Sequence, residues 1–594
     1  MRELILTGYK DFWPQDEESA LFFGPWCFSH NPKRKFWEQN RFKLAPSPWQ
    51  NPTDILEASL YIDSLSDRII PRLTEIMNEF FNVTHNEAYW RACTILWLTH
   101  CLGMLYDRYK RLENVGCLQN RFMVKILKNH DAASNDFWDF AKKINESHYY
   151  NLSLMSEIIK SGQFDFLGYE EIDCTQGAYS LEILGENSGK VKNRVVDFLK
   201  SSAKSVFNYT DELNLKNSSV HLGLIYGMSV FDRFRIQFAC KPGLFLKKIE
   251  EKGGRVIKGN REGITKFNLE FGACNKFEEI IEGLLLKYLP DSLLVSYETK
   301  KNITPKINIW IGNDIYTSAK KASQIGSILE NGGRWISVQH GGGYGQLLSL
   351  PNGKVEYATG GEFITWGWKH DNVYTSSKYY ALPSPMLSKL KQHKEKEHTL
   401  IFVGTISPAY MYRLATFLTP EQLTDYFSNK LKFLKTLETS IMKSIKYRPY
   451  FEDYGTNEKE FLSRILNQDQ FLIGGRLTTK FSQARLVVID HLNTSFLESL
   501  VINVPTILFC NKSHYNFSEY ATPFFNRLRD VGILHDDPYS AAKKVNKVWV
   551  DPKSWWEGDQ LQAVRKEFCC QFAHSSKSWR KEWLGFLKSI QDRQ

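Results

Sequence analysis

The spacing of hydrophobic residues changes along this chain, from a helical period in the first third to alternating strands and helices later. Between residues 54 and 81, apolar side chains recur every three to four positions, which is the period of a helix with one buried face. A second helix, predicted over 87–112, is apolar on most sides and is therefore expected to be buried. A strand is predicted over 3–7, and further helices over 122–128, 136–143 and 152–161.

From about residue 218, compact apolar runs alternate with helical segments. Before a charged stretch at 382–398, strands are predicted at 307–311, 335–338 and 363–366. After that stretch the pattern restarts, with strands at 399–403, 471–473, 486–489 and 506–509 and helices at 409–417 and 427–445. Strands separated by helices form parallel sheets with right-handed crossovers. The sequence therefore predicts an α/β protein of two successive α/β units with a cleft between them.

These patterns also predict the domain boundaries. Residues 1–381 are expected to form an N-terminal α/β domain with a large helical insertion at about 52–215. Residues 382–398 are expected to be a linker, and 399–550 a C-terminal α/β domain. The tail, 551–594, is predicted to be helical and to pack back on the N-terminal half.

The composition is that of a globular protein. The chain has 594 residues, of which 42% are hydrophobic and 24% charged, and this excludes a mostly disordered chain. The net charge of +10 is small for this length and the basic residues are not clustered, so no nucleic-acid partner is expected. A mildly basic protein is suited to phosphorylated ligands or to an anionic membrane surface. The aromatic fraction of 14% indicates either large aromatic cores or a cleft where rings stack on a ligand.

The cysteines and the N-terminus favour a cytoplasmic protein. The ten cysteines include no Cys-x-x-Cys pair, so we predict reduced thiols without a disulfide framework or a zinc site. The first residues lack the apolar stretch of a signal peptide. No run of the sequence approaches the about 20 apolar residues that a membrane span needs.

The most informative motif follows the strand predicted at 486–489. A short polar loop leads into a helix, and a helix that begins at the carboxyl edge of a parallel sheet favours an anionic ligand. The candidate ligand-binding residues here are Asp490, His491, Asn493, Thr494, Ser495 and Glu498. Gly404 and Thr405 occupy the equivalent place after the strand at 399–403. An ordinary capped crossover between two strands would show the same pattern.

A second motif, Val338-Gln-His-Gly-Gly-Gly-Tyr-Gly345, directly follows another strand. It lacks the spacing of a P-loop and of a dinucleotide-binding fingerprint. The glycines Gly341, Gly342 and Gly343 allow a ligand to approach the backbone, and His340 is a candidate base or phosphate contact. A plain glycine-rich turn is the alternative interpretation.

Two further groups of polar residues have a structural and a functional interpretation. Lys369 and His370 follow Trp366-Gly-Trp368 and could neutralise a phosphate or a carboxylate, whereas the tryptophans are more typical of packing. On the long helix, Asp107 and Arg108 are expected to belong to a buried network, and the alternative is that they form a wall of the cleft. Adjacent helix positions do not face each other, so no contact between these two is expected.

Eight short motifs carry a resemblance to a known family: Gly24-Pro-Trp-Cys27, Tyr89-Trp-Arg91, Tyr106-Asp-Arg-Tyr109, Asn135-Asp136, Tyr150-Asn151, Gln339–Gly345, Trp366-Gly-Trp368 and Asp490–Pro505. In this order they resemble a family of bacterial transferases encoded beside surface-polysaccharide and O-antigen genes, and the resemblance covers nearly the whole chain. The last motif and the His340-Gly341 pair also resemble GT-B transferases of capsule and teichoic acid (the CDP-glycerol type). More distantly, they resemble transferases that move Kdo-type acidic sugars from CMP donors. Where the capsule group has Tyr-Ser-Ser, this chain has His491 and Asn493-Thr-Ser495.

The resemblance implies a GT-B-like fold of two Rossmann-like domains facing a cleft, and a glycosyltransferase of O-antigen, capsule or lipopolysaccharide biosynthesis. The N-terminal half would bind a lipid-linked or glycan acceptor. The C-terminal half would bind a nucleotide-activated sugar, for which a CMP-activated acidic sugar is one candidate. Catalysis would need neither metal nor cofactor, and His340 would be the acid–base or phosphate-contacting residue. Peripheral contact with the inner membrane is also expected. The alternatives are a CDP-alditol phosphotransferase and a non-catalytic glycan-binding or assembly protein.

Overall fold

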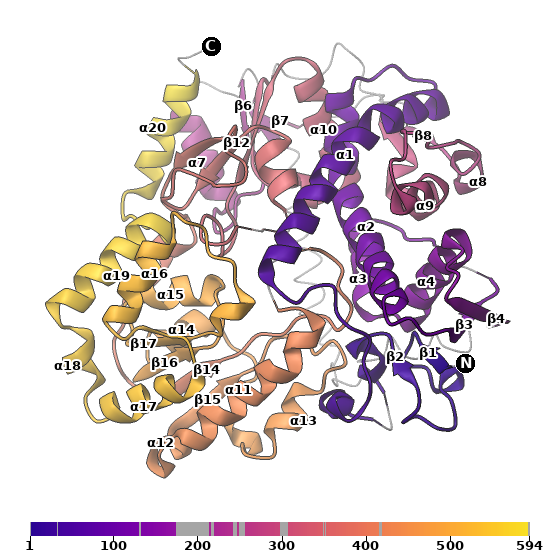
Figure 1. Cartoon of the computed structure of the whole chain (residues 1–594). Coiled ribbons are helices and arrows are strands. Elements are labelled where there is room, and N and C mark those ends of the chain that lie inside the picture. Colours follow the sequence, from indigo (N-terminus) through magenta and orange to yellow (C-terminus); the bar gives the residue numbers. More distant parts are fainter. Residues whose placement is uncertain are drawn as a thin grey trace, which may run out of the picture.

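Three parallel β-sheets organise the chain, and helices pack on their faces (Figure 1). This computed structural model describes residues 2–31, 34–129, 132–173, 213–215, 219–240, 246–248, 256–297, 307–348, 350, 352–414 and 418–591. Two short antiparallel pairs complete the strands of the described part: β5 (Leu213–Leu215) with β7 (Leu246–Lys248), and β8 (Val256–Lys258) with β9 (Val295–Tyr297).

The first sheet has the order β2 (Leu21–Phe22), β1 (Arg2–Ile5), β3 (Phe122–Leu127) and β4 (Leu167–Ile172). Its helices are α1 (Pro52–Phe81), α2 (Glu87–Gly116), α3 (Phe137–Glu146) and α4 (His148–Gly162). The helix predicted over 122–128 is wrong, because this segment is β3, whose buried and exposed residues nearly alternate. The helical insertion predicted at about 52–215 also needs correction. Two of its segments are strands that pair with β1 or with each other, and its residues 174–212 lie outside the described part.

The middle sheet has the order β13 (Lys378–Ala381), β12 (Glu362–Thr365), β11 (Arg334–Val338), β10 (Ile309–Ile311) and β6 (Val220–Leu222). Helices α2 and α10 (Ala319–Glu330) pack on this sheet, and their buried side chains form one apolar cluster with β10 and β11. Another cluster joins its strands to α7 (Val230–Cys240) and to α20 (Trp579–Gln591) at the end of the chain. The part predicted as one N-terminal α/β domain therefore carries two parallel sheets.

The third sheet has the order β15 (Ile445–Arg448), β14 (Leu400–Val403), β16 (Leu486–Ile489), β17 (Thr506–Phe509) and β18 (Leu534–His535). In chain order this is 2-1-3-4-5, a doubly wound arrangement with a topological switch point between β14 and β16. The three central strands are fully buried, as expected for parallel strands covered on both faces. The predicted strand at 471–473 is wrong, because Phe471 makes only an isolated bridge to Tyr447 and the edge strand is β15.

Helices cover the third sheet and return the chain to the middle one. They are α11 (Leu423–Thr436), α12 (Thr439–Ser444), α13 (Glu458–Leu462), α14 (Leu477–Phe481), α15 (Thr494–Ile502), α16 (Thr522–Asp530), α17 (Pro538–Val548), α18 (Pro552–Trp556) and α19 (Asp559–Phe572). In the tail, α19 packs on α15 and α16, whereas α20 packs on α7. The middle and third sheets are the two α/β units predicted from the sequence. The first sheet shares a continuous apolar core with the third.

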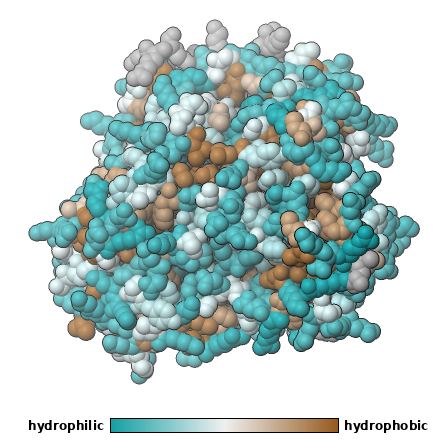
Figure 2. All heavy atoms as spheres, viewed as in Figure 1, coloured by the Kyte–Doolittle hydropathy of each residue, from teal (hydrophilic) through white to brown (hydrophobic). Residues whose placement is uncertain are grey.

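The surface in the view of Figure 2 is mostly polar, with apolar residues in small groups. No helix in the described ranges combines the length and the apolar composition needed to cross a membrane. The nine cysteines in the described part are free thiols.

Candidate functional site

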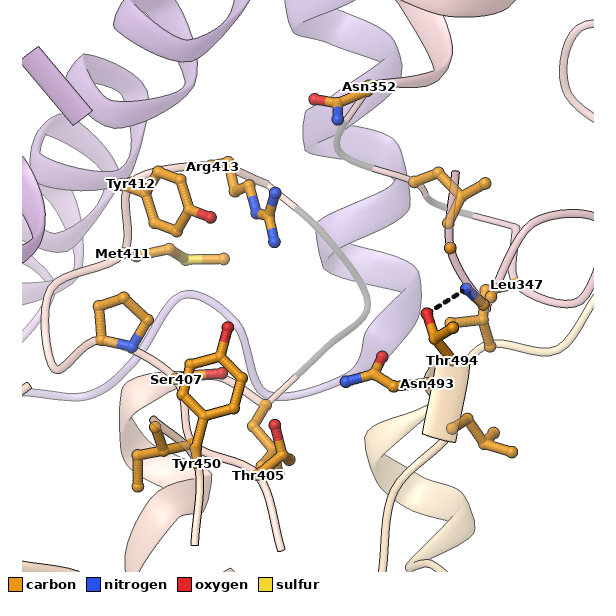
Figure 3. Close-up of a pocket in the computed structure, with 18 of the residues that line it drawn as sticks. Leu347, Asn352, Thr405, Ser407, Met411, Tyr412, Arg413, Tyr450, Asn493 and Thr494 are labelled. Carbon is orange, nitrogen blue, oxygen red and sulfur yellow. Dashed lines mark hydrogen bonds between the residues drawn. The ribbon is translucent and has the colours of Figure 1, made fainter. Parts of the chain in front are cut away.

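A pocket lies where the loops after β11, β14 and β16 meet. Its cavity has a volume of about 280 Å³ and is lined by residues 340–344, 405–408, 410–413 and 492–494, with further residues from neighbouring loops (Figure 3). Val403 of β14 pairs with Ile489 of β16, so the loops that follow these strands leave the sheet side by side. The pocket therefore lies at the topological switch point, where doubly wound sheets bind their ligands.

The glycine loop and the start of α15 touch each other, although they are about 150 residues apart in the sequence. The backbone N–H of Gly342 donates a hydrogen bond to Oγ1 of Thr494 at 3.0 Å. A Cβ at Gly342 would lie 2.6 Å from the carbonyl carbon of Asn493 and 2.7 Å from the nitrogen of Thr494. Only glycine fits this backbone-to-backbone contact. The structure thus brings the two motifs singled out in the sequence into one wall of the pocket.

Arg413 is a cation of the pocket that sequence reasoning missed. In Figure 3 its guanidinium points into the space that Asn493 also faces. It makes no hydrogen bond or ion pair with any described residue, and its polar contact is with the ring of Tyr412, 4.8 Å away. No aspartate or glutamate is found among the described residues that line the pocket. The sequence predicted a helix over 409–417, so Arg413 was not expected in a loop beside the pocket. The described part of this segment, 409–414, is an irregular loop.

Tyrosines form much of the remaining wall. Five of them line the cavity: Tyr344, Tyr410, Tyr412, Tyr450 and Tyr454. Tyrosine rings can stack on a sugar or a base while their hydroxyls bind polar groups. Part of the aromatic excess of the sequence therefore belongs to the pocket, and part to the buried cores, which contain Trp335, Trp366 and Trp368.

His340 lies in the pocket with a buried carboxylate behind it. Its side chain is 36% exposed, and its Nδ1 lies 3.3 Å from Oε1 of Glu356, which is fully buried. The same Nδ1 lies 3.1 Å from Nδ2 of Asn313, whose side chain is fixed by hydrogen bonds to the backbone of Val338. The amide N–H of Asn313 donates toward Nδ1, and the hydroxyl of Tyr344 lies 3.2 Å from Nδ1 and 3.3 Å from Nε2. The negative charge of an ionised Glu356 stabilises the positive charge that the ring gains when it takes up a proton.

Glu356 is held in a polar pocket of its own. The hydroxyl of Tyr316 donates to Oε1 at 2.7 Å. Burial raises the pKa of the Glu356 carboxyl, and the neighbouring His340 opposes this increase. Glu356 lies in a short helical segment (Lys354–Ala358) that no motif marks, so sequence reasoning could not assign it.

Asp490 and His491 do not line the pocket. They are 2% and 4% exposed, and they belong to a buried network behind the strand ends. Oδ1 of Asp490 accepts from the hydroxyl of Tyr426 at 2.5 Å and lies 2.9 Å from Nδ1 of His491. Lys430 is fully buried between Asp490, 3.6 Å away, and Glu458, with which it forms an ion pair. We conclude that this network positions the loops after β14 and β16.

The other predicted site residues fall into two groups. Thr405, Asn493 and Thr494 line the pocket together with the three glycines. Not among its described lining residues are Gly404, Lys369, His370, Ser495 and Glu498. A Cβ at Gly404 would lie 2.0 Å from the hydroxyl of Tyr447, so this glycine serves packing. Lys369 and His370 are exposed, and the hydroxyl of Ser495 lies 3.2 Å from Nε2 of His491.

The network predicted on the long helix is present, although one detail of the prediction is wrong. Asp107, Arg108 and Arg111 are at most 1% exposed. Arg108 nevertheless donates to Oδ2 of the adjacent Asp107 at 2.8 Å. Arg111 donates to the other carboxylate oxygen at 2.9 Å.

This network holds the pocket loop. Arg108 also donates to the carbonyl of Met411, and Arg111 donates to Glu421 at 2.5 Å. His148, the first residue of α4, lies 2.6 Å from the hydroxyl of Tyr410. The loop that carries Arg413 is therefore anchored to the helices of the first sheet at several points.

The model of one protein family, the LIC12162 family transferases, matches residues 2–587. The chain belongs to this family. It is accordingly a transferase, as the sequence predicts, and the match covers nearly the whole chain.

Comparison with solved structures finds distant likenesses. A structure described as that of a UDP-N-acetylglucosamine 2-epimerase from Listeria monocytogenes is 10% identical, with 48% of this chain and 76% of that chain covered and a TM-score of 0.32. The S. aureus MnaA–UDP complex is 9% identical, with 48% and 77% covered and a TM-score of 0.31. The wall teichoic acid polymerase TagF is 10% identical, with 48% and 82% covered and a TM-score of 0.28. No curated protein matches the chain.

The carboxyl of Glu498 yields a prediction about how the stability of this transferase depends on pH. Burial raises the pKa of its carboxyl to about 7, and Arg476 opposes the increase. Between the unfolded value of about 4.3 and about 7, the folded chain holds a proton that the unfolded chain releases, so this group lowers stability as pH rises. We expect Glu498→Gln to raise the melting temperature more at pH 8 than at pH 5. Equal differences from the wild type at the two pH values would contradict the assignment.

Proposed function

We infer that this transferase moves a glycosyl group from a nucleotide-activated sugar to a hydroxyl of a lipid-linked or glycan acceptor, in the biosynthesis of bacterial surface polysaccharide. The pocket is the proposed donor site. Arg413, the glycine loop and the start of α15 would hold the phosphate, and the tyrosines would contact the sugar or the base.

The observation that carries this proposal is the charge of the pocket. Its described lining contains Arg413, a cation with no hydrogen bond or ion pair to any described residue, together with His340, and no carboxylate. The backbone N–H groups at the start of α15 add partial positive charge at the same place. Asn493, at the N-cap, makes no side-chain capping bond, and its amide faces the cavity in Figure 3. Such a site selects an anionic ligand at the edge of the sheet where nucleotides bind in this fold class.

The chemistry proposed for these groups is a displacement at the anomeric carbon. The acceptor oxygen forms a bond to that carbon as its proton passes to the imidazole of His340. The bond between the carbon and the phosphate oxygen breaks, and the electron pair leaves with the phosphate. The charge that develops there would be stabilised by Arg413 and by the backbone donors of the two loops.

Titration calorimetry with UDP, GDP, CDP and CMP tests the donor site. We expect one nucleotide to bind clearly better than the others, and Arg413→Gln to weaken its binding about 10- to 100-fold, which is typical of losing a charged hydrogen-bond donor. Lys369→Gln is the matched control, because it removes an exposed cation outside the pocket and should leave affinity unchanged.

Other outcomes decide between the alternatives. Turnover of a CDP-alditol, with transfer of its alditol phosphate unit and release of CMP, would replace the proposal with an alditol phosphotransferase. Failure of all four nucleotides to bind would favour a non-catalytic glycan-binding protein. A loss of affinity in Lys369→Gln as large as in Arg413→Gln would show that the pocket is not the donor site.

A further inference from the structure

Helix α7 presents three phenylalanines to solvent and buries two charged side chains. Phe231, Phe234 and Phe238 are 67%, 36% and 44% exposed, and they recur at spacings of three and four residues along one face. Asp232 and Arg233, by contrast, are 3% and 6% exposed. Such exposed phenylalanines are unusual on a surface helix, whose solvent face is normally polar.

The exposed aromatic residues form a concentrated group. Tyr226, just before α7, is 53% exposed. Together with the three phenylalanines it makes up four of the twelve large apolar side chains exposed in the described part of the chain, within thirteen consecutive residues. Scattered apolar side chains are normal on a surface, whereas such a concentration marks an interaction site. We call these four residues the α7 patch.

Helix α20 lies beside α7 along its length. Nε of Arg580 donates to Oδ1 of Asp232 at 2.7 Å, and Sγ of Cys240 donates to Oε1 of Gln591 at 2.9 Å. The two contacts join the starts and the ends of the helices, which are therefore parallel neighbours, as Figure 1 also shows. Lys588 falls on the same stripe of α20 as Arg580 and Gln591, because these positions differ by eight and three residues.

The charge around the α7 patch is positive. The carboxylate of Asp232 is neutralised by Arg580 and by Lys389, whose Nζ lies 2.7 Å away. The exposed charged residues of the two helices are all basic: Arg235, Arg580, Lys581 and Lys588. Arg235 lies close to the patch itself, with its guanidinium 5.9 Å from the ring of Phe231.

We propose that the α7 patch and the basic residues of α20 form a docking surface for an anionic lipid bilayer. Exposed aromatic rings enter the interface between headgroups and acyl chains, and flanking lysines and arginines bind anionic headgroups. The basic residues beside the aromatic rings complement the negative charge of an anionic bilayer. This complementarity favours a membrane over a second copy of the chain as the partner of the patch. The surface would bring the chain to membrane-bound molecules, and it does not depend on the identity of the sugar donor.

Vesicle co-sedimentation of the full chain tests the proposal. We expect binding to vesicles of phosphatidylglycerol and phosphatidylethanolamine, and at least 10-fold weaker binding to phosphatidylcholine alone. The triple variant Phe231→Ser, Phe234→Ser, Phe238→Ser should bind the anionic vesicles at least 10-fold more weakly than the wild type. Lys581→Glu with Lys588→Glu should weaken binding to anionic vesicles and reduce its sensitivity to salt.

The matched control is the triple variant Ile473→Ser, Tyr539→Ser, Val550→Ser. It removes three apolar side chains that are 70%, 50% and 84% exposed on another part of the surface. We expect it to bind vesicles like the wild type. The proposal is overturned if the wild type does not bind anionic vesicles, or if both triple variants lose binding equally. It is also overturned if light scattering shows a dimer that only the α7 variant abolishes, because the patch would then bind a second copy.

Discussion

Replacing His340 with alanine should lower kcat by about 10²- to 10⁴-fold, the usual contribution of a general acid or base, and leave donor affinity nearly unchanged. The reason is the position of the ring, which reaches into the pocket while Glu356 lies 3.3 Å from Nδ1. The measurement is turnover of the donor identified by calorimetry, together with the Kd of its nucleotide. A variant with normal kcat and weakened donor binding would instead make His340 a phosphate contact.

Glu356→Gln is the companion variant, because glutamine keeps the size of the side chain and removes its charge. Without the carboxylate, the positive charge that the His340 ring gains on taking up the proton loses a stabilising negative charge 3.3 Å away. We expect kcat to fall while the melting temperature and the nucleotide Kd stay within error of the wild type. A fall in all three together would mean that Glu356 only supports the fold.

Replacing Arg108 with alanine should cost about 3–5 kcal/mol of stability, the loss typical of removing one partner from a buried charge network. Asp107, Asn151 and the carbonyl of Met411 all accept hydrogen bonds from this guanidinium, which is fully buried. Since Met411 belongs to the pocket loop, we also expect weaker nucleotide binding well below the unfolding temperature. Thermal unfolding followed by circular dichroism, with calorimetry well below the melting temperature, measures both effects.

The control is Arg41→Ala. The Arg41 side chain is 73% exposed and pairs with Glu38 at 3.6 Å, so its loss should cost less than about 1 kcal/mol. Equal melting temperatures for the two variants would show that the network on α2 does not stabilise the fold. Normal nucleotide binding by a destabilised Arg108→Ala would show that α2 does not hold the pocket loop.

The sequence predicted the middle and third sheets well, because buried parallel strands are short apolar runs between helices. Leu486–Ile489 is such a run, and it is fully buried. The strands that were missed or misread are less apolar. Ile445–Arg448 follows a helix without a break in pattern, and Phe122–Leu127 contains Lys125, so a helical period could be fitted to it. In segments this short, the local pattern of apolar residues cannot distinguish the period of a helix from that of a strand.

The site residues were also predicted only in part. Thr494 and the glycines at 341–343 were predicted from their place after strands, and they line the pocket. Asp490 and His491 follow the same rule, yet they are buried. A position after a strand determines the edge of the sheet where a residue lies. It does not determine whether the side chain points into the cavity or into the packing beneath it.

The sequence alone determined the fold class, the edge of the sheets where the pocket lies, and the two motifs that meet there. Apolar periodicity and helix-capping residues are local properties, and each is readable within about ten positions. Only the tertiary structure placed Arg413 in the pocket, Glu356 behind His340 and the first sheet against the pocket loop. These contacts join residues 16 to more than 300 positions apart, and they depend on how whole elements pack, which no local pattern contains.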